Sequence, residues 1–524
     1  MVTGRVARRR RAWAVAATLC LFTLVVYWLS LAPTITWQHD GADGGDLATA
    51  VAVGGVPHPS GYPTYLALAE FFNALPLGGD VAYRLNVMSA VCAAIAVGLL
   101  GLAAGQSLSC LFPEPNLQIA SPKGGGESIP PGYVEVSAAT AALTFAFSTP
   151  FWSQAVIAEV YTLNALWVAL LLGLALRVRA GSKSPLSWLC LATGLALGNH
   201  LSVVLVLPLI AAQVWPAYRR LSHGLRVGLL FLVLAGLSIY GLIPWRAMSQ
   251  PPLNWGGADR WGGFWWLVTG QAYRRYVFGL PWAYAGTRAL ALVQIIVRAL
   301  AWWGLPVALW GWRLMVRHDR LLAAGSLLTV ALIAIYALGY NTTDSYLYLL
   351  PALMLISLWL AWGLLDLFRL ARSYLRAGQV TWTLLLLPAL SAAFSFSAMS
   401  LHHDRTALDF AETALRQAAP DALILVDDDR HTFALWYARY ALGQRPDVAV
   451  VNANLLGYDW YRLSLTKAHS DLLLARETGD LVRQNIERHP VYTVGDTLTL
   501  PGQFVIEVVG DSHRLRRVST ATKP

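Results

Sequence analysis

Apolar runs long enough to cross a bilayer recur through the first 400 residues of the chain, and no other feature limits its possible folds as strongly. A membrane-spanning helix needs about 20 mostly apolar residues. About eleven such runs can be recognised, at residues 13–31, 86–104, 134–149, 161–176, 186–197, 201–215, 227–243, 299–315, 321–338, 346–365 and 380–399. The run at 186–197 is short, so it and the next run form either two spans or one broken element. The chain is therefore predicted to be an α-helical polytopic membrane protein.

The overall composition agrees with this class. Hydrophobic residues make up 56% of the chain and charged residues only 13%, and the mean hydropathy is +0.50. A water-soluble chain of 524 residues does not tolerate such a composition. A formal charge of +10 would suggest a nucleic-acid partner for a soluble protein, but here the basic residues form short clusters between apolar runs. We therefore expect these clusters to set the orientation in the membrane, and we expect no nucleic-acid partner.

The basic clusters predict one orientation, because Lys and Arg concentrate on the cytoplasmic side. With the cluster at 8–11 in the cytoplasm, four later clusters fall on the same side, at 177–183, 219–226, 313–320 and 369–376. The loop at 107–132 is placed there by counting alone. The first run is longer than the core of a signal peptide and lacks a small-x-small cleavage site, so it is predicted to be an anchor. We expect a multi-pass protein of a plasma membrane, with a cytoplasmic N-terminus and an extracytoplasmic C-terminal domain.

Unusual polar residues collect on the predicted outer side. The loop at 33–84 contains Asp40, Asp43, Asp46 and His58, and the next outer turn contains Glu159. The Trp-rich loop at 245–288, the turn at 341–344 and everything after residue 399 are also outside. Carboxylates so close to hydrocarbon lose hydration, so they are kept there mainly where they meet a proton, a cation or a polar substrate. The loop at 33–84 is therefore the candidate active site.

The chain changes character after Met399, where the long apolar runs end and carboxylates, Pro and Gly return. We predict a transmembrane catalytic domain at 1–399 and a soluble extracytoplasmic α/β domain at 400–524. Residues 421–426 and 447–451 are typical of buried strands and 432–442 of the helix between them, which gives a βαβ unit. Asp427, Asp428 and Asp429 follow the first strand, where such sheets bind ligands. The simpler interpretation for Asp429 is that it caps the following helix.

Five motifs in order resemble a bacterial membrane family of formerly unknown function. That family is related to the eukaryotic transmembrane O-mannosyltransferase acting on plexin-type and receptor ectodomains. The matching segments are Pro33 to Trp37 with Asp43 to Asp46 and His58 to Pro63, then Trp152 to Ala155 with Glu159 to Tyr161, then Gly194 to His200, then Arg246-Ala247 with Pro252 to Gly256, and finally Asp427 to Phe433. Family members often have Asp-Ser-Gly-Glu where this chain has Asp43-Gly44-Gly45-Asp46. The acidic pair is kept, with a shorter carboxylate at Asp46.

The resemblance implies a GT-C glycosyltransferase that takes a sugar, with mannose as one candidate, from a polyprenyl phosphate on the outer face. Asp43 would be the general base, with two glycines after it that let backbone and substrate approach closely. Asp46 and Glu159 would be second carboxylates that orient the acceptor or share a proton. The acceptor is expected to be a protein or a glycan. No metal site is implied, and a divalent cation stays open.

The other motif residues are expected to bind substrate. Arg246 lies where the seventh span ends, and its guanidinium is either a phosphate ligand or a snorkelling interfacial arginine. His58 either donates to phosphate or holds a rigid turn between prolines. The resemblance also assigns substrate binding to Tyr161, Asn254, Trp255 and His200, although a histidine such as His200 at a span end is more often a packing residue. Arg298 has the same ambiguity as Arg246, with less support.

Several alternatives remain at this point. Six tryptophans between Trp245 and Trp282 are expected to form an interfacial belt, and one helix there could wall a sugar pocket. A transporter or lipid flippase would show charges near mid-span and a repeated half, and neither is evident. A receptor would leave the acidic first loop unexplained. Because the C-terminal domain follows the last span, away from any lipid-borne donor, we expect it to help recognise the acceptor and not to be the catalytic centre.

Overall fold

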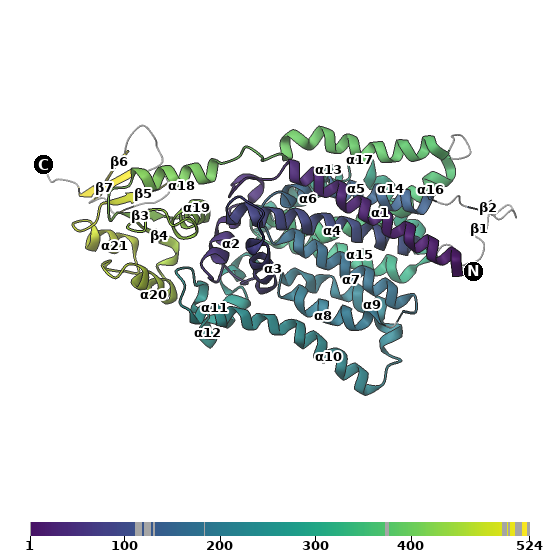
Figure 1. Cartoon of the computed structure of the whole chain (residues 1–524), viewed down its shortest axis with the longest axis horizontal. Coiled ribbons are helices and arrows are strands. Elements are labelled where there is room, and N and C mark those ends of the chain that lie inside the picture. Colours follow the sequence, from purple (N-terminus) through teal and green to yellow (C-terminus); the bar gives the residue numbers. More distant parts are fainter. Residues whose placement is uncertain are drawn as a thin grey trace.

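The computed structural model is a long bundle of helices with a small α/β domain packed on one end (Figure 1). It describes residues 2–109, 118–119, 127–128, 132–182, 184–371, 377–494, 500, 504–508 and 516–520. Lys183, Arg372, Arg376 and most of the predicted loop at 107–132 lie outside the described residues. We call the end of the bundle that carries the C-terminal domain the capped end, and the opposite end, where α1 begins, the basic end.

Each predicted apolar run falls on a helix of the bundle. These helices are α1 (Val2–Leu29), α4 (Val81–Ser109), α5 (Tyr133–Ala146), α7 (Tyr161–Arg179), α8 (Pro185–Leu197), α9 (Leu207–Tyr218), α10 (His223–Leu237), α14 (Gly304–His318), α15 (Arg320–Gly339), α16 (Leu350–Ala371) and α17 (Ala377–Met399). Within the described part of the chain, seven helices are long and apolar enough to cross a membrane alone. They are Arg9–Leu29, Val81–Leu108, Tyr161–Arg179, His223–Met248, Arg320–Gly339, Asp344–Ala371 and Gly378–Met399. The count of about eleven independent spans is therefore too high by this measure, because helices such as α5 and α8 are shorter.

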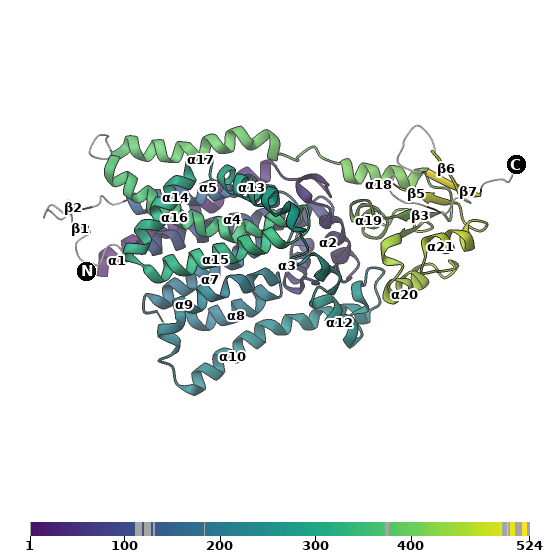
Figure 2. The ribbon, with the colours of Figure 1, turned by 180° about the vertical axis from the view of Figure 1, so that it is seen from behind.

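The bundle has a buried centre and an apolar outside, as a membrane protein requires. α16 is almost entirely buried and packs against α14 and α5, while α4 packs against α1 and α7. α17 and α10 lie on opposite sides of the bundle (Figure 1 and Figure 2) and expose large side chains such as Phe394 and Phe231. The third motif begins at a helix crossing, since a Cβ on Gly194 would lie 2.3 Å from the Val233 carbonyl oxygen. Only glycine lets α8 and α10 approach so closely.

The basic clusters meet at the basic end. Arg179, at the end of α7, bonds Gln213 of α9 and pairs at 2.8 Å with Asp319, which lies between α14 and α15. Arg226 bonds the carbonyl of Arg219 in the turn between α9 and α10. The structure therefore places these clusters on one side of the bundle, opposite the C-terminal domain.

The capped end is built from elements that lie mostly in predicted loops; the main exceptions are residues 201–205, 238–243 and 346–349, which fall within predicted apolar runs. These elements are η1 (Gln38–Asp40), α2 (Asp43–Ala52), α3 (Pro63–Ala74), α6 (Thr149–Ala155), η2 (Leu201–Leu205), η3 (Ser238–Gly241), α11 (Leu242–Met248), η4 (Trp255–Gly257), α12 (Trp261–Val268), η5 (Gln271–Tyr276), α13 (Trp282–Ala299) and η6 (Asp344–Leu349). α13 bends by 89° from α14, so it runs across the bundle direction. Trp282 is 93% exposed and Trp261 74%, as in an interfacial belt.

The C-terminal domain is an α/β unit, as predicted. Its elements are α18 (Thr406–Gln417), β3 (Leu423–Val426), α19 (Asp429–Trp436), the π-helical turn η7 (Tyr437–Ala441), β4 (Ala449–Asn452), η8 (Ala453–Leu455), α20 (Asp459–Ala468), α21 (Thr478–Asn485), β5 (Val491–Thr493), β6 (Phe504–Val508) and β7 (Arg516–Thr520). The sheet order is β4-β3-β5-β7-β6. β3 pairs in parallel with β4, Leu423 opposite Ala449, and with β5, which gives the βαβ unit. β7 pairs antiparallel with both β5 and β6.

Outside the C-terminal domain, a two-stranded antiparallel ladder joins β1 (Gln118–Ile119) and β2 (Glu127–Ser128), between α4 and α5.

Candidate active site

The acidic motif begins helix α2 at the capped end. Asp43 and Asp46 lie in its first turn, where carboxylates favour the helix dipole, and their spacing places them on one face. Their environments differ sharply. The side chain of Asp43 is 44% exposed, whereas that of Asp46 is 0% exposed. The two acids of the motif therefore cannot have the same function.

Asp46 is a buried carboxylate whose two oxygens are engaged by three donors. Its Oδ2 lies 2.8 Å from Nδ1 of His58 and accepts the backbone N–H of His58 at 2.9 Å. Its Oδ1 accepts the indole N–H of Trp255 at 3.0 Å. Charge-assisted bonds of this kind offset the cost of burying a carboxylate. Asp46 thus fixes the His58 turn and the η4 turn to α2, and it is not free to act on a substrate.

His58 bridges the two acids. Its Nε2 lies 3.4 Å from Oδ2 of Asp43 and 3.2 Å from the hydroxyl of Tyr62. Burial lowers the pKa of His58, but the charge of Asp43 and the hydrogen bond with Asp46 outweigh burial and raise the pKa to about 9. The ring is therefore protonated at neutral pH and both nitrogens face protein carboxylates. This geometry favours the structural interpretation of His58 over donation to phosphate.

Glu159 joins the group from the segment before α7, so the first and second motifs do meet. It is buried, its Oε2 accepts the backbone N–H of Val160, and its own backbone N–H bonds Ser89 of α4. Burial, followed by the charge of Asp43, raises the pKa of Glu159 well above its usual value. Burial also raises the pKa of Asp43, while His58 acts in the opposite direction and favours the anion. The shift is thus larger for Glu159, and protonated His58 partly offsets the effect of burial on Asp43.

Two further carboxylates belong to this group, and the sequence analysis did not assign them to it. Asp344, the first residue of η6, interacts electrostatically with both Asp43 and Glu159. Asp429 of the C-terminal domain interacts with Asp43, His58 and Asp46. The only signal for Asp344 was its place in a turn on the same predicted side. Asp40, from the same loop as Asp43, is exposed and accepts a hydrogen bond from the hydroxyl of Tyr346 at 2.7 Å.

The prediction that Asp429 caps α19 is wrong. The cap is Asp428, whose Oδ1 accepts the backbone N–H of His431 at 2.8 Å. The C-terminal domain also contacts the loop that carries the acidic motif. A Cβ on Gly45 would lie 2.8 Å from the carbonyl oxygen of Phe433, and the Phe433 ring stacks near His58 with centroids 6.2 Å apart. The glycines of the motif thus admit the protein's own backbone, since a Cβ on Gly44 would similarly meet Ala158.

Arg246 is not a snorkelling arginine. Its side chain is 1% exposed and forms an ion pair with Glu70 of α3. Its Nε and Nη1 atoms are buried and have no hydrogen-bond partner among the described residues. The rest of the fourth motif lies close by along the chain, with Asn254 buried and paired by a backbone bridge to Val56 of the first loop. No motif in the sequence indicated Glu70 as the partner of Arg246.

His200 and Tyr161 lie in an aromatic group next to the acids. The His200 ring is 5.7 Å from Tyr161, 5.8 Å from Tyr348 and 6.4 Å from Tyr62, measured between centroids. Burial lowers the pKa of His200 to about 4, so the ring is neutral. Its Nδ1 accepts the backbone N–H of Ser202, which leaves Nε2 as the protonated nitrogen. The group combines flat apolar faces with hydroxyl and imidazole donors, as sugar sites do.

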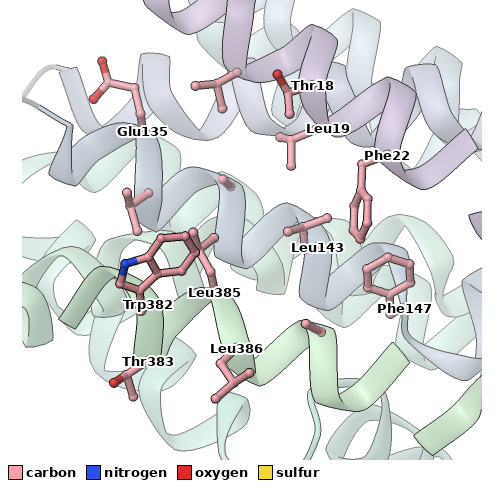
Figure 3. Close-up of a pocket in the computed structure, with 14 residues that line it drawn as sticks. Thr18, Leu19, Phe22, Glu135, Leu143, Phe147, Trp382, Thr383, Leu385 and Leu386 are labelled. Carbon is pink, nitrogen blue, oxygen red and sulfur yellow. The ribbon is translucent and has the colours of Figure 1, made fainter. Parts of the chain in front are cut away.

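Two cavities of different polarity lie in the bundle. A cavity of about 670 Å³ lies between α1, α5 and α17 and is lined mainly by apolar side chains such as Leu19, Phe147 and Trp382 (Figure 3). A smaller one, of about 270 Å³, adjoins the catalytic loop and is lined by polar and apolar groups that include His39, Ser153 and Arg298. Among the described residues, no group of three His, Cys, Asp or Glu side chains is arranged to hold a metal ion.

Comparison with known proteins supplies an independent view of the same regions. Residues 43–222 match the Protein O-mannosyl-transferase TMEM260 N-terminal domain, and residues 407–471 match the TMEM260-associated domain 2. The Mus musculus Protein O-mannosyl-transferase TMEM260 is 26% identical over 480 residues, which cover 86% of this chain and 64% of the mouse protein. The chain is similar to the TMEM260 proteins over most of its length. The resemblance predicted from the five motifs is confirmed.

A more distant relative and two solved structures extend the comparison. The Dictyostelium discoideum Protein O-mannosyl-transferase tmem260 is 20% identical over 552 residues, covering 90% of this chain and 62% of that protein. The chain thus spans less than two thirds of the length of each TMEM260 relative. ArnT from Cupriavidus metallidurans, solved with undecaprenyl phosphate, superposes with a TM-score of 0.57 at 13% identity and covers 97% of this chain and 98% of ArnT. The apo form of ArnT gives a TM-score of 0.58 at 14% identity, over 96% and 97% of the two chains. The predicted GT-C-like fold is confirmed.

Proposed function

We propose that this protein is a membrane glycosyltransferase that moves a sugar from a polyprenyl-phosphate donor to an acceptor hydroxyl, with Asp43 as general base. One observation carries the proposal. Asp43 is the half-exposed member of a group in which Asp46 and Glu159 are buried and engaged by protein donors. A base must reach its substrate, and of these three acids only Asp43 can do so without a rearrangement of buried bonds.

The geometry suits a single displacement at the anomeric carbon. The acceptor oxygen forms a bond to that carbon while the bond from the carbon to the donor phosphate oxygen breaks, and the electron pair leaves with the polyprenyl phosphate. The hydroxyl proton passes to Asp43. His58, protonated and 3.4 Å from Asp43, keeps the carboxylate ionised until the proton arrives. Asp46 holds His58 in place.

Arg246 is the cation we assign to the leaving phosphate. Two of its guanidinium nitrogens lack acceptors, and phosphate oxygens are suitable acceptors for a paired guanidinium fork. Because the Arg246 side chain is 1% exposed while that of Glu70 is 43% exposed, the phosphate reaches Arg246 by displacing Glu70. Trp255 and Asn254 hold the segment between Arg246 and the carboxylates in place. Tyr161 and His200 line the proposed sugar site.

The names of the relatives support a narrower version of the proposal. Two TMEM260 relatives are called protein O-mannosyl-transferases, and the ArnT structure contains undecaprenyl phosphate. We therefore propose mannose as the sugar, a protein hydroxyl as the acceptor, and the capped end as the extracytoplasmic end. A divalent cation is not part of the proposed mechanism.

Two measurements test the proposal. Purified protein in lipid vesicles, given synthetic polyprenyl-phosphate mannose and a Ser/Thr-containing peptide, should yield a peptide one hexose heavier by mass spectrometry. Absence of product with intact donor, over a panel of peptides drawn from receptor ectodomains, would contradict it. For orientation, Ser470→Cys at the capped end should react with an impermeant thiol reagent in intact cells, whereas Ser182→Cys at the basic end should react only after lysis.

A further inference from the structure

The fifth sequence motif ends on α19 at Phe433, and this residue reaches the catalytic group from the C-terminal domain. The Phe433 side chain is buried, and its ring lies nearly parallel to the His58 imidazole, with an interplanar angle of 16° and centroids 6.2 Å apart. Its backbone carbonyl oxygen lies against Gly45 of α2, where a Cβ would be only 2.8 Å away. Phe433 thus packs against the helix that begins with Asp43 and faces the histidine that bridges the two acids of the motif.

Trp255, whose indole N–H bonds Asp46, is packed against the same domain. Its ring lies 5.4 Å from that of Trp460 on α20 and 6.3 Å from that of Phe433, measured between centroids, which is the usual range for packed aromatic pairs. The backbones approach closely here too, because a Cβ on Gly257 would lie 3.1 Å from the Cβ of Trp460. Both side chains that bond the Asp46 carboxylate therefore have aromatic neighbours from the C-terminal domain.

Polar contacts fix α19 to the membrane domain on either side of Phe433. Before it along the chain, the carbonyl oxygen of Arg430 accepts the indole N–H of Trp37 at 3.0 Å, and the Arg430 guanidinium lies 4.2 Å from the Trp37 ring centroid, within cation–π range. After it, the hydroxyl of Tyr437 accepts the backbone N–H of Ala82 at 3.2 Å. A smaller side chain at Phe433 therefore removes the ring over the imidazole but leaves these contacts in place.

We propose that Phe433 and Trp460 are positioning residues, through which the C-terminal domain completes the active site of the membrane domain. They hold the imidazole and the indole that bond Asp46. The imidazole in turn places its Nε2 3.4 Å from Oδ2 of the base Asp43. A displacement of about 1 Å at a reacting group can slow a reaction about 10²-fold, so packing against these two rings is enough to change the rate. The inference rests on the function proposed above.

Steady-state sugar transfer by the full-length protein tests the role of the Phe433 ring. We expect Phe433→Ala to lower kcat about tenfold, because the imidazole loses the ring that covers it, while KM for the donor stays within about twofold. Phe433→Leu keeps an apolar side chain at this place and should lower kcat only about threefold. Leu481→Ala is the matched control, since Leu481 is buried on α21, on the side of the domain away from the bundle (Figure 1).

Hydrogen exchange measures the positioning without reference to catalysis. The backbone N–H of His58 bonds Oδ2 of Asp46 at 2.9 Å, so it is protected only while the His58 turn stays on α2. By mass spectrometry, the peptide spanning residues 56–62 should exchange about tenfold faster in Phe433→Ala and in Trp460→Ala than in the wild type. Leu481→Ala should leave the exchange of this peptide unchanged.

Each outcome decides the inference. A kcat within about twofold of the wild-type value in Phe433→Ala overturns it. An equal loss of kcat in Leu481→Ala assigns the effect to general loosening of the domain and also overturns it, as does unchanged exchange at residues 56–62 in both Phe433→Ala and Trp460→Ala. If Phe433→Ala is not recovered as folded protein, Phe433→Leu takes its place, and a wild-type kcat and wild-type exchange in that variant overturn the inference.

Failure of the proposed function gives a different result. If the wild-type protein transfers no sugar from the polyprenyl-phosphate donor, the proposed function is wrong. The exchange comparison still decides whether Phe433 and Trp460 hold the His58 turn. Conversely, normal sugar transfer by Phe433→Ala leaves the proposed function intact and removes only the role of the C-terminal domain in the active site.

Discussion

The two ends of the helix bundle use charge in opposite ways. At the basic end, Arg179 and Arg369 lie in the last turns of their helices, and the pair of Arg369 with Asp366 at 3.5 Å is partly exposed, whereas Asp319, the partner of Arg179, is buried. At the capped end, Asp46, Glu159 and Arg246 are buried and are held by specific partners. Exposed pairs contribute little to stability, whereas burying a charge is costly unless it is fully paired. The charges at the basic end are therefore suited to setting the orientation in the membrane, and those at the capped end are suited to a catalytic function.

Substitution of His58, at the capped end, should have the largest effect on stability and on sugar transfer. His58→Ala leaves Asp46 buried without its ion pair, and loss of one partner of a buried pair costs about 3–5 kcal/mol. We expect a lower unfolding midpoint and loss of sugar transfer, measured on detergent-purified protein. His403→Ala, an exposed histidine beside the domain linker, is the control and should change neither.

His58 should also make the free energy of unfolding depend on pH. The folded-state pKa of His58, about 9, lies above its ordinary value of 6.5. Its stabilising contribution is therefore complete below pH 6.5 and is lost as the pH rises through 9. Wild-type stability should fall over this range, and His58→Ala should lack that component of the fall. An identical pH dependence in both proteins would mean that His58 is not the charged bridge.

Arg246→Lys should have the next largest effect. Lysine keeps the charge that pairs with Glu70 but cannot form the paired fork. Loss of about one charge-assisted hydrogen bond to phosphate should weaken donor binding about tenfold, seen as slower transfer at limiting donor. Arg298→Lys, also at the capped end, should behave like wild type. Normal transfer by Arg246→Lys at limiting donor would remove Arg246 from the phosphate site.

Gly45→Ala should disturb the contact between domains. The added methyl would lie 2.8 Å from the Phe433 carbonyl oxygen, and overpacking of this kind costs about 1–3 kcal/mol. We expect faster proteolysis in the linker at 400–405. Gly173→Ala, on α7 with open space around its Cβ position, is the control. Equal cleavage rates would argue against tight docking.

The smallest effect is expected at the basic end. Arg369→Gln removes a partly exposed pair and should change stability by no more than about 1 kcal/mol, with no change in sugar transfer. The unfolding midpoint and the transfer rate of Arg369→Gln are measured alongside those of His58→Ala. A loss of transfer comparable to that of His58→Ala would break the distinction between the two ends.

Much of the fold could be predicted from the sequence, because the signals for it are local. Apolar runs predicted the bundle helices, and the strand pattern around Ile424 predicted the βαβ unit. Features that depend on tertiary contact could not be found. Helix α2 carries two glycines after Asp43, which disfavour helix in isolation but fit against Ala158 and Phe433.

The candidate site shows the same limit. The motifs identified Asp43, Asp46, His58 and Glu159, which the structure brings together. They did not identify Glu70 as the partner of Arg246, because that ion pair joins residues 176 positions apart. They also assigned the helix cap to Asp429 instead of Asp428, since adjacent aspartates give equivalent capping signals. Only the backbone conformation, extended at Asp428 and helical from Asp429, distinguishes them.

The central claim is that Asp43, and not another acid of the capped end, accepts the proton. Single-turnover transfer by Asp43→Asn and Glu159→Gln, with donor binding measured on the same preparations, tests it most directly. Asparagine keeps the size of the side chain but is a much poorer base. We predict that Asp43→Asn binds the polyprenyl-phosphate sugar normally and transfers it about 10²-fold more slowly or worse, while Glu159→Gln is impaired less. Wild-type turnover in Asp43→Asn together with an inactive Glu159→Gln would contradict the account and place the base on the second loop.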